Sequence, residues 1–287
     1  MVSIIRRISK IAPALLGALI ISALPVTSDD AVTGREIASK WENAIVRVQV
    51  VIKSRMSVEG RESGSYENKA EGTGTVVDPS GLTLIPLSVT NPAEAFGLED
   101  DEGYNFKTEL GDIKIRLRDG KEIPAIVVLR DKDLDIALIR PKQKQSTPFA
   151  CVNLEESSLP QVLDDLVLLT RLGKVANQAT AVSMSRIQAI VDKPRKFYVM
   201  GTSSMGDDLG GAVFSLDGKL VGVILLRTIP GEKRNFDRDN ILPIIVPAAD
   251  IAEVAKQAPD KPAEEPTVKP LAPVKPATPP AKVKPAK

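Results

Sequence analysis

The residues whose types and spacing could support chemistry lie in three segments of the chain. A glycine-rich segment, residues 72–81, leads to Ser88, a second segment, residues 131–138, holds Asp135, and residues 207–212 form a loop with two adjacent glycines. A hydroxyl, a carboxylate and a glycine-rich loop are parts used in nucleophilic catalysis, which also needs a general base to activate the nucleophile. Histidine suits that role because its pKa lies near neutral pH, but the chain contains no histidine.

The three segments read GTGTVVDPSG, DKDLDIAL and DDLGGA, and in this order and spacing they resemble the trypsin-like serine proteases of the HtrA/Deg type. In that family the motifs read roughly G-S-G-x-V-I-D-x-x-G…N-x-H-V, then D-x-A-L, then G-N-S-G-G-A. The resemblance covers roughly residues 44–257. It implies an all-β fold of two six-stranded antiparallel β-barrels with the active-site cleft between them, closed by a short C-terminal helix.

The resemblance also shows where the chemistry has changed. The chain keeps the family's aspartate as Asp135, but it has Ser88 where the family has histidine and Leu209 where the family has the nucleophilic serine. Asp207 replaces the glycine that lets backbone N–H groups point into the oxyanion hole, where a carboxylate would repel the developing charge. We therefore interpret Ser88, Asp135 and Leu209 as vestigial triad positions and expect no catalytic residue. The equivalents of the oxyanion loop are Asp207, Asp208, Gly210 and Gly211.

Other side chains of the sequence are poor substitutes for the missing nucleophile and base. Three further serines lie near the loop, and a lysine could in principle act as their base, although no spacing supports a Ser–Lys pair. These residues are Ser203, Ser204, Ser215, Lys132 and Lys219. Without histidine and with the single cysteine Cys151, the usual zinc ligands are absent, so we expect no metal site and no cofactor.

The elements that must position these segments read mostly as strands. Residues 46–50 and 113–118 alternate apolar and polar side chains with period two, as half-buried strands do. Turn signals fall at residues 78–81, at Asp119-Gly120 and at Asp217-Gly218, and the last predicts a hairpin from 212–216 to 219–225.

Three further expectations concern segments outside these strands. Residues 31–43 have the apolar spacing of a short helix. Residues 53–71 and 91–110 are polar without periodicity, which predicts surface loops. Residues 250–257 are expected to form the closing helix, with Asp250 as its cap.

The two ends of the chain differ in composition from its middle. Residues 1–28 combine Arg6, Arg7 and Lys10 with an apolar run, which predicts a signal peptide and no membrane anchor after its cleavage. Residues 29–257 form the expected double-barrel domain. Residues 258–287 are rich in Pro, Lys and Ala, and we expect a disordered tail where the resembled enzymes usually carry a PDZ domain.

These observations favour an exported, catalytically inactive pseudoprotease that binds a peptide, an unfolded protein or a partner protein in the inter-barrel cleft, or regulates such a partner. Periplasm or cell envelope is the expected location, and secretion is also open. An envelope scaffold with an idle cleft and a serine endopeptidase using non-standard groups are the alternatives. The net charge of +1 does not favour nucleic-acid binding, and the oligomeric state is left open.

Overall fold

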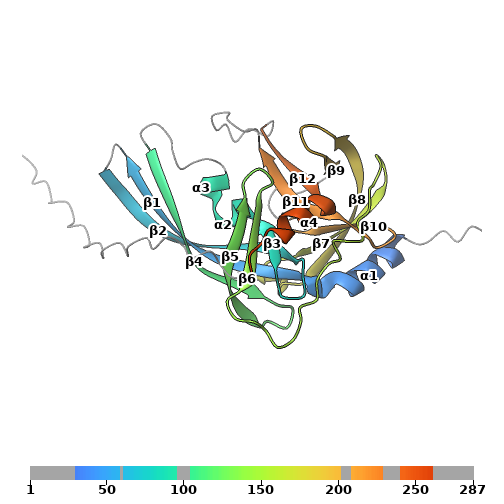
Figure 1. The fold of residues 1–287 in the computed structure, drawn as a ribbon, viewed down its shortest axis with the longest axis horizontal. Coiled ribbons are helices and arrows are strands. Elements are labelled where there is room, and N and C mark those ends of the chain that lie inside the picture. The colour runs from blue at the N-terminus through green and yellow to red at the C-terminus, as the bar shows by residue number, and fades with distance from the viewer. Residues whose placement is uncertain (1–29, 59–60, 96–103, 202–207, 229–239, 261–287) are drawn as a thin grey trace, which may run out of the picture.

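The computed structural model describes residues 30–58, 61–95, 104–201, 208–228 and 240–260 (Figure 1). Two closed antiparallel barrels of six strands each make up most of this part of the chain, as expected. The first barrel runs in the order β1-β2-β3-β6-β5-β4 and the second in the order β10-β11-β12-β9-β8-β7.

Each barrel is built from consecutive strands of the sequence. The first contains β1 (Ile45–Val58), β2 (Arg61–Val76), β3 (Thr83–Pro86), β4 (Tyr104–Arg116), β5 (Glu122–Asp131) and β6 (Ile136–Pro141). The second contains β7 (Asp165–Arg171), β8 (Thr180–Val191), β9 (Phe197–Met200), β10 (Ala212–Ser215), β11 (Leu220–Thr228) and β12 (Ile241–Pro247). The helical elements are α1 (Asp30–Trp41), η1 (Glu42–Ala44), α2 (Leu87–Thr90), α3 (Pro92–Ala95), η2 (Lys174–Ala176) and α4 (Ala248–Lys256).

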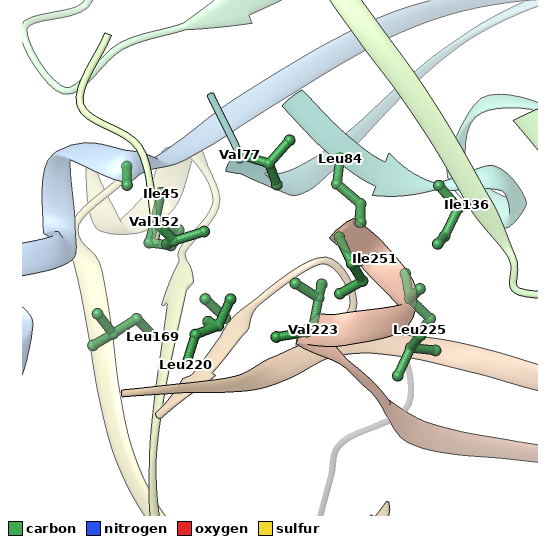
Figure 2. Close-up of a cluster of buried hydrophobic side chains, with 14 of the residues drawn as sticks. Ile45, Val77, Leu84, Ile136, Val152, Leu169, Leu220, Val223, Leu225 and Ile251 are labelled. Atoms are coloured by element: carbon green, nitrogen blue, oxygen red, sulfur yellow. The ribbon is translucent and has the colours of Figure 1, made fainter. Parts of the chain in front are cut away.

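The two barrels share one apolar layer. Strands β3, β6, β7 and β11 are buried on both faces, because one face lines a barrel interior and the other packs against the opposite barrel. On β6, Ala137 and Ile139 point into the first barrel, whereas Ile136 and Leu138 join the shared layer. Figure 2 shows side chains of this layer from both barrels and from α4. Double-sided burial explains why these strands read as nearly continuous apolar runs.

A buried arginine crosses the boundary between the barrels. Arg171, at the end of β7, is 4% exposed, and its Nε donates a hydrogen bond to the carbonyl of Ile45 at 2.7 Å. Its Nη2 donates to the carbonyl of Glu42 at 2.9 Å, and its backbone N–H donates to the Thr73 hydroxyl at 3.2 Å. Burial and nearby Arg118 lower the pKa of this guanidinium, an effect that Glu42 partly offsets. Arg171 thus ties β7 to the start of the first barrel.

The alternation and turns read from the sequence are confirmed. Val46, Val48 and Val50 are buried in the first barrel, and the Ala212–Ser215 and Leu220–Thr228 strands pair as the expected hairpin. The glycines of the three expected turns, Gly81, Gly120 and Gly218, all adopt positive φ. The short N-terminal helix is also present as α1.

Three sequence interpretations are wrong. Residues 53–71 are not a loop but belong to the β1–β2 hairpin. Of the expected loop 91–110, residues 92–95 form α3 and residues 104–110 belong to β4, whereas residues 96–103 lie outside the described residues. These strands project beyond the barrel (Figure 1), and at residues 66–69 side chains on both faces are exposed, so this part of the sequence lacks the apolar alternation that marks a half-buried strand. The closing helix begins at Ala248 rather than at Asp250, and Pro247 precedes it without a side-chain cap.

Two of the three expected segments of the chain, the signal peptide and the tail, fall largely or wholly outside the described residues. The expected signal peptide lies outside them, as does nearly all of the expected tail. Within them, no helix has the length and apolar character needed to span a membrane.

The Arg171 contacts predict how strongly the barrels depend on this side chain. Arg171→Met keeps most of the apolar stem but removes the donors, so we expect the free energy of unfolding to fall by about 2–4 kcal/mol. Arg186→Met, which removes an exposed ion pair with Asp165 on the same barrel, should change it little. Urea unfolding of both variants tests this, and an equal response would contradict a special role for Arg171.

Candidate functional site

The site centres on the buried carboxylate of Asp135. This residue is 5% exposed and lies in the turn that connects β5 to β6. The backbone N–H of Ser88 donates to its Oδ1 at 2.7 Å, and the Ser88 hydroxyl donates to its Oδ2 at 3.1 Å. From the second barrel, the backbone N–H of Leu226 donates to Oδ2 at 3.0 Å. Both carboxylate oxygens are therefore bound, and the donors come from both barrels.

Local backbone geometry brings Ser88 to Asp135. Strand β3 ends at Pro86, and the backbone N–H of Leu87 donates to the carbonyl of Asp135 at 2.8 Å, which fixes the start of α2 beside the carboxylate. Asp135 adopts a φ of 57°, a left-handed conformation that Asp tolerates better than most residues. Ser88, only 9% exposed, has its hydroxyl directed inward.

Burial dominates the acidity of Asp135. Removal of the carboxylate from water raises the pKa of Asp135 to about 7, although hydrogen bonds from Leu226 and Ser88 oppose the rise. The carboxylate holds the α2 turn and β11 together, and the raised pKa of Asp135 makes its charge sensitive to pH near neutrality.

Leu209 belongs to the interior of the second barrel. It is 7% exposed and packs with the apolar cluster of that barrel. An aliphatic side chain has no lone pair with which to attack a carbonyl. The position that a serine holds in the resembled family is therefore used here for packing.

The loop after Leu209 docks tightly against the first barrel. Gly210 has a φ of 82°, and a Cβ at this position would lie 2.0 Å from the carbonyl oxygen of Thr73. The Thr75 hydroxyl donates to the Gly210 carbonyl at 2.8 Å, while the Gly210 N–H donates to the carbonyl of Ile224. Gly211 is also crowded, because a Cβ there would lie 2.6 Å from the Thr170 methyl group. Packing alone thus requires both glycines.

The structure brings Ser88 and Asp135 into direct contact and places the Asp208–Gly211 turn against β2. Asp208 accepts a hydrogen bond from the Gly211 N–H through its carbonyl. Asp207 lies outside the described residues, as do Ser203 and Ser204.

The proposed substitutes for the triad are arranged for other purposes. The Ser215 hydroxyl lies against the carboxylate of Asp217 and 3.2 Å from the Lys219 carbonyl, at the tip of the β10–β11 hairpin. The Lys219 ammonium pairs with Asp217 at 3.2 Å rather than with the serine. Lys132 is exposed in the β5–β6 turn. Within the part of the chain that the structure describes, no group of three or more carboxylate or thiol side chains could hold a metal ion.

Sequence reasoning missed several residues of the site. Leu226 contributes only its backbone N–H, which leaves no signature in the side-chain pattern. Thr73 and Thr75 lie inside the glycine-rich segment 72–81, and both are buried polar residues on a strand, which was the signal that could have identified them. Their hydroxyls bond to Arg171 and Gly210 across the boundary between the barrels.

Comparison with known proteins agrees with this architecture. The family model of the trypsin-like peptidase domain matches residues 72–223, more than half of the chain, and the chain therefore belongs to that family. The matched range includes Ser88, Asp135 and Leu209. The chain is also 24% identical over 200 residues to a protein of Arabidopsis thaliana named "Putative protease Do-like 14", covering 68% of this chain and 44% of that protein. The chain thus spans less than half of the length of this relative.

Gly210 offers a test of the loop docking. We expect Gly210→Ala to lower the free energy of unfolding by at least about 2 kcal/mol more than Gly120→Ala, because both glycines have similar positive φ but only Gly210 faces a backbone atom. No atom lies within 4 Å of a Cβ built on Gly120. Chemical denaturation measures the difference. Similar decreases in the free energy of unfolding for both variants would show that the backbone at Thr73 can move to make room for the added methyl group at no measurable cost.

The raised pKa of Asp135 predicts a pH dependence. The folded state retains the Asp135 proton up to about pH 7, whereas the unfolded chain releases it near pH 4, so the folded state binds more protons in this window. Stability should therefore fall as pH rises from 4 to 7, by as much as about 4 kcal/mol from this group, and the contribution should level off above pH 7.

Asp135→Asn isolates that contribution. Asparagine tolerates the left-handed backbone. Its NH₂ group takes the place of one carboxylate oxygen and so faces a backbone N–H donor. This lowers the free energy of unfolding by an amount that does not change with pH. The wild-type free energy of unfolding minus that of the variant should decline between pH 4 and 7. Asp133→Asn, an exposed substitution two residues away, is the matched control. A flat difference for Asp135→Asn would contradict the raised pKa.

Proposed function

We propose that this protein is an exported member of the trypsin-like family without peptidase activity, which binds a peptide, an unfolded protein segment or a partner protein between its barrels as a binding or regulatory module. The observation that carries the proposal is the closed Asp135 carboxylate. In a working triad this group orients an imidazole, and here Ser88 and Leu226 occupy its oxygens.

The chemistry of the remaining groups supports the loss of hydrolysis. A serine hydroxyl is no general base at neutral pH, and the chain supplies no histidine elsewhere. Leu209 has no nucleophilic atom. The relative from Arabidopsis is named a putative protease, and we propose that this chain lacks that activity.

A backbone edge beside Asp135 supports peptide binding. Strand β11 pairs with β10 only as far as Val223, while it pairs with β12 up to Thr228. Ile224 still bonds to the Gly210–Gly211 turn through its N–H and its C=O, and beyond Ile224 no strand within the described residues pairs with the edge that faces Asp135. The Leu226 N–H points to this side, and alternation along a strand directs the Thr228 N–H the same way. An extended peptide could add here as a strand, a mode of recognition that requires no triad.

The two alternative functions, an envelope scaffold and an unusual endopeptidase, have less support among the described residues. An envelope scaffold would use the tail and leave the β11 edge idle, and the tail lies outside the described residues. An endopeptidase with unusual groups would need a base near a serine, and Ser215 and Lys219 are engaged with Asp217 instead. The export assignment rests on the charged and apolar pattern of residues 1–28.

A peptide pool derived from a proteome tests both halves of the proposal. The purified protein is incubated with the pool, and mass spectrometry reads the retained and free fractions over time. We expect retained, uncut peptides that share a pattern. New peptide termini that accumulate with time would overturn the assignment of inactivity, and absence of any retained peptide would favour the scaffold.

Substitution at Thr228 locates the binding edge. Thr228→Pro removes the N–H that would donate to a bound strand, so we expect about tenfold weaker retention of the selected peptides. Thr228→Val keeps that N–H and nearly the same shape, and should retain them as the wild type does. Thermal melts of both variants check the fold. Equal retention by the two variants would move the binding site away from β11.

A further inference from the structure

The β1–β2 hairpin and β4 form a three-stranded ribbon that extends from the first barrel away from the rest of the molecule (Figure 1). Strand β1 lies in its middle, since it pairs with β2 on one side and with β4 on the other. Strand β2 pairs with β3 only at Thr75 and Val76. Within the described residues, its remaining edge from Arg61 to Gly74 therefore pairs with no strand.

Such an edge is a template for another strand, because its backbone N–H and C=O groups are arranged to pair. Proteins commonly guard edges with charged side chains, which repel an incoming chain. The charges on β2 are arranged differently, in an order that matches a second copy of the same strand.

A row of alternating charges crosses the ribbon on its outer face. Lys53 of β1 lies opposite Glu109 of β4 on one side and opposite Glu67 of β2 on the other. The row therefore reads negative, positive, negative from β4 to the open edge. A cation at the next position across would continue the alternation, since opposite charges stabilise directly facing pairs.

A second copy of β2 supplies that cation. When two β2 strands pair antiparallel about a twofold axis at Asn68, Lys69 of each copy lies opposite Glu67 of the other. On the inner face the same register sets Tyr66, which is 62% exposed, opposite Ala70. Registers centred on Glu67 or on Lys69 instead place like charges opposite each other. The sequence thus selects one register among its neighbours.

We propose that this protein forms a twofold symmetric dimer through β2, in which two ribbons join into one continuous sheet. The interface uses the same patch on both copies, as isologous dimers do. It lies on the ribbon rather than at Asp135 or the β11 edge, so it stands independently of the proposed peptide binding.

Charge reversal within the pair gives a direct test. Lys69→Glu leaves two glutamates facing two glutamates across the interface, and Glu67→Lys leaves lysines facing lysines. Sedimentation equilibrium of the full chain should show a dimer for the wild type and at least about tenfold weaker association for each single variant. Higher salt should reduce these differences, because both positions are exposed.

Two rescue experiments exclude a simple folding defect. The double variant Glu67→Lys/Lys69→Glu restores opposite pairs across the interface and should recover most of the association, although its new lysine faces Lys53 of β1 within each copy. An equimolar mixture of the two single variants should form a heterodimer, because each glutamate then faces a lysine of the other chain. Circular dichroism melts verify that every variant is folded.

The outcomes separate cleanly. A wild type that remains monomeric at all concentrations tested would overturn the proposal. A dimer that is unaffected by the single reversals would place the interface elsewhere and also overturn it. Loss of association in the single variants without recovery in the double variant or the mixture would reject the Asn68-centred register.

Discussion

The constraint on which the rest of the structure depends is the apolar layer that the two barrels share. Because β3, β6, β7 and β11 are buried on both faces, each polar group at this boundary needs a partner inside the protein. Arg171 finds carbonyl oxygens of the first barrel, and Asp135 finds a backbone donor of the second. Apolar packing has no preferred direction, whereas the hydrogen bonds of these two side chains do, and they therefore fix how one barrel is oriented against the other.

The same constraint explains why the chain keeps two adjacent glycines after Leu209. Gly210 and Gly211 are required by their closeness to Thr73 and Thr170, whatever the chemistry of the neighbouring residue. Leu209 fills the interior of the second barrel, and the hydroxyl of Ser88 satisfies part of the buried carboxylate. Motifs that read as catalytic can thus be maintained by packing and hydrogen bonding alone.

Both proposed interactions rely on open backbone edges. The edge of β11 lies beside Asp135, whereas the edge of β2 lies on the ribbon outside the barrel. Edge pairing draws on main-chain groups that every residue except proline provides, so it does not depend on catalytic side chains. Side chains then set the register, as the charges at Glu67 and Lys69 do.

The sequence by itself determined the half-buried strands, the three glycine turns and the absence of a histidine base, because these follow from local periodicity, turn chemistry and residue identity, whereas the double barrel was expected only from the resemblance to the trypsin-like proteases. The local pattern failed on residues 53–71, since a strand with exposed side chains on both faces, as at residues 66–69, has no apolar alternation. Only the tertiary structure decided that Asp135 is sealed and raised in pKa, that Leu209 points inward, and that Arg171 joins the barrels. Those properties depend on contacts with backbone groups distant in sequence and on exclusion of water, and the local sequence pattern shows neither.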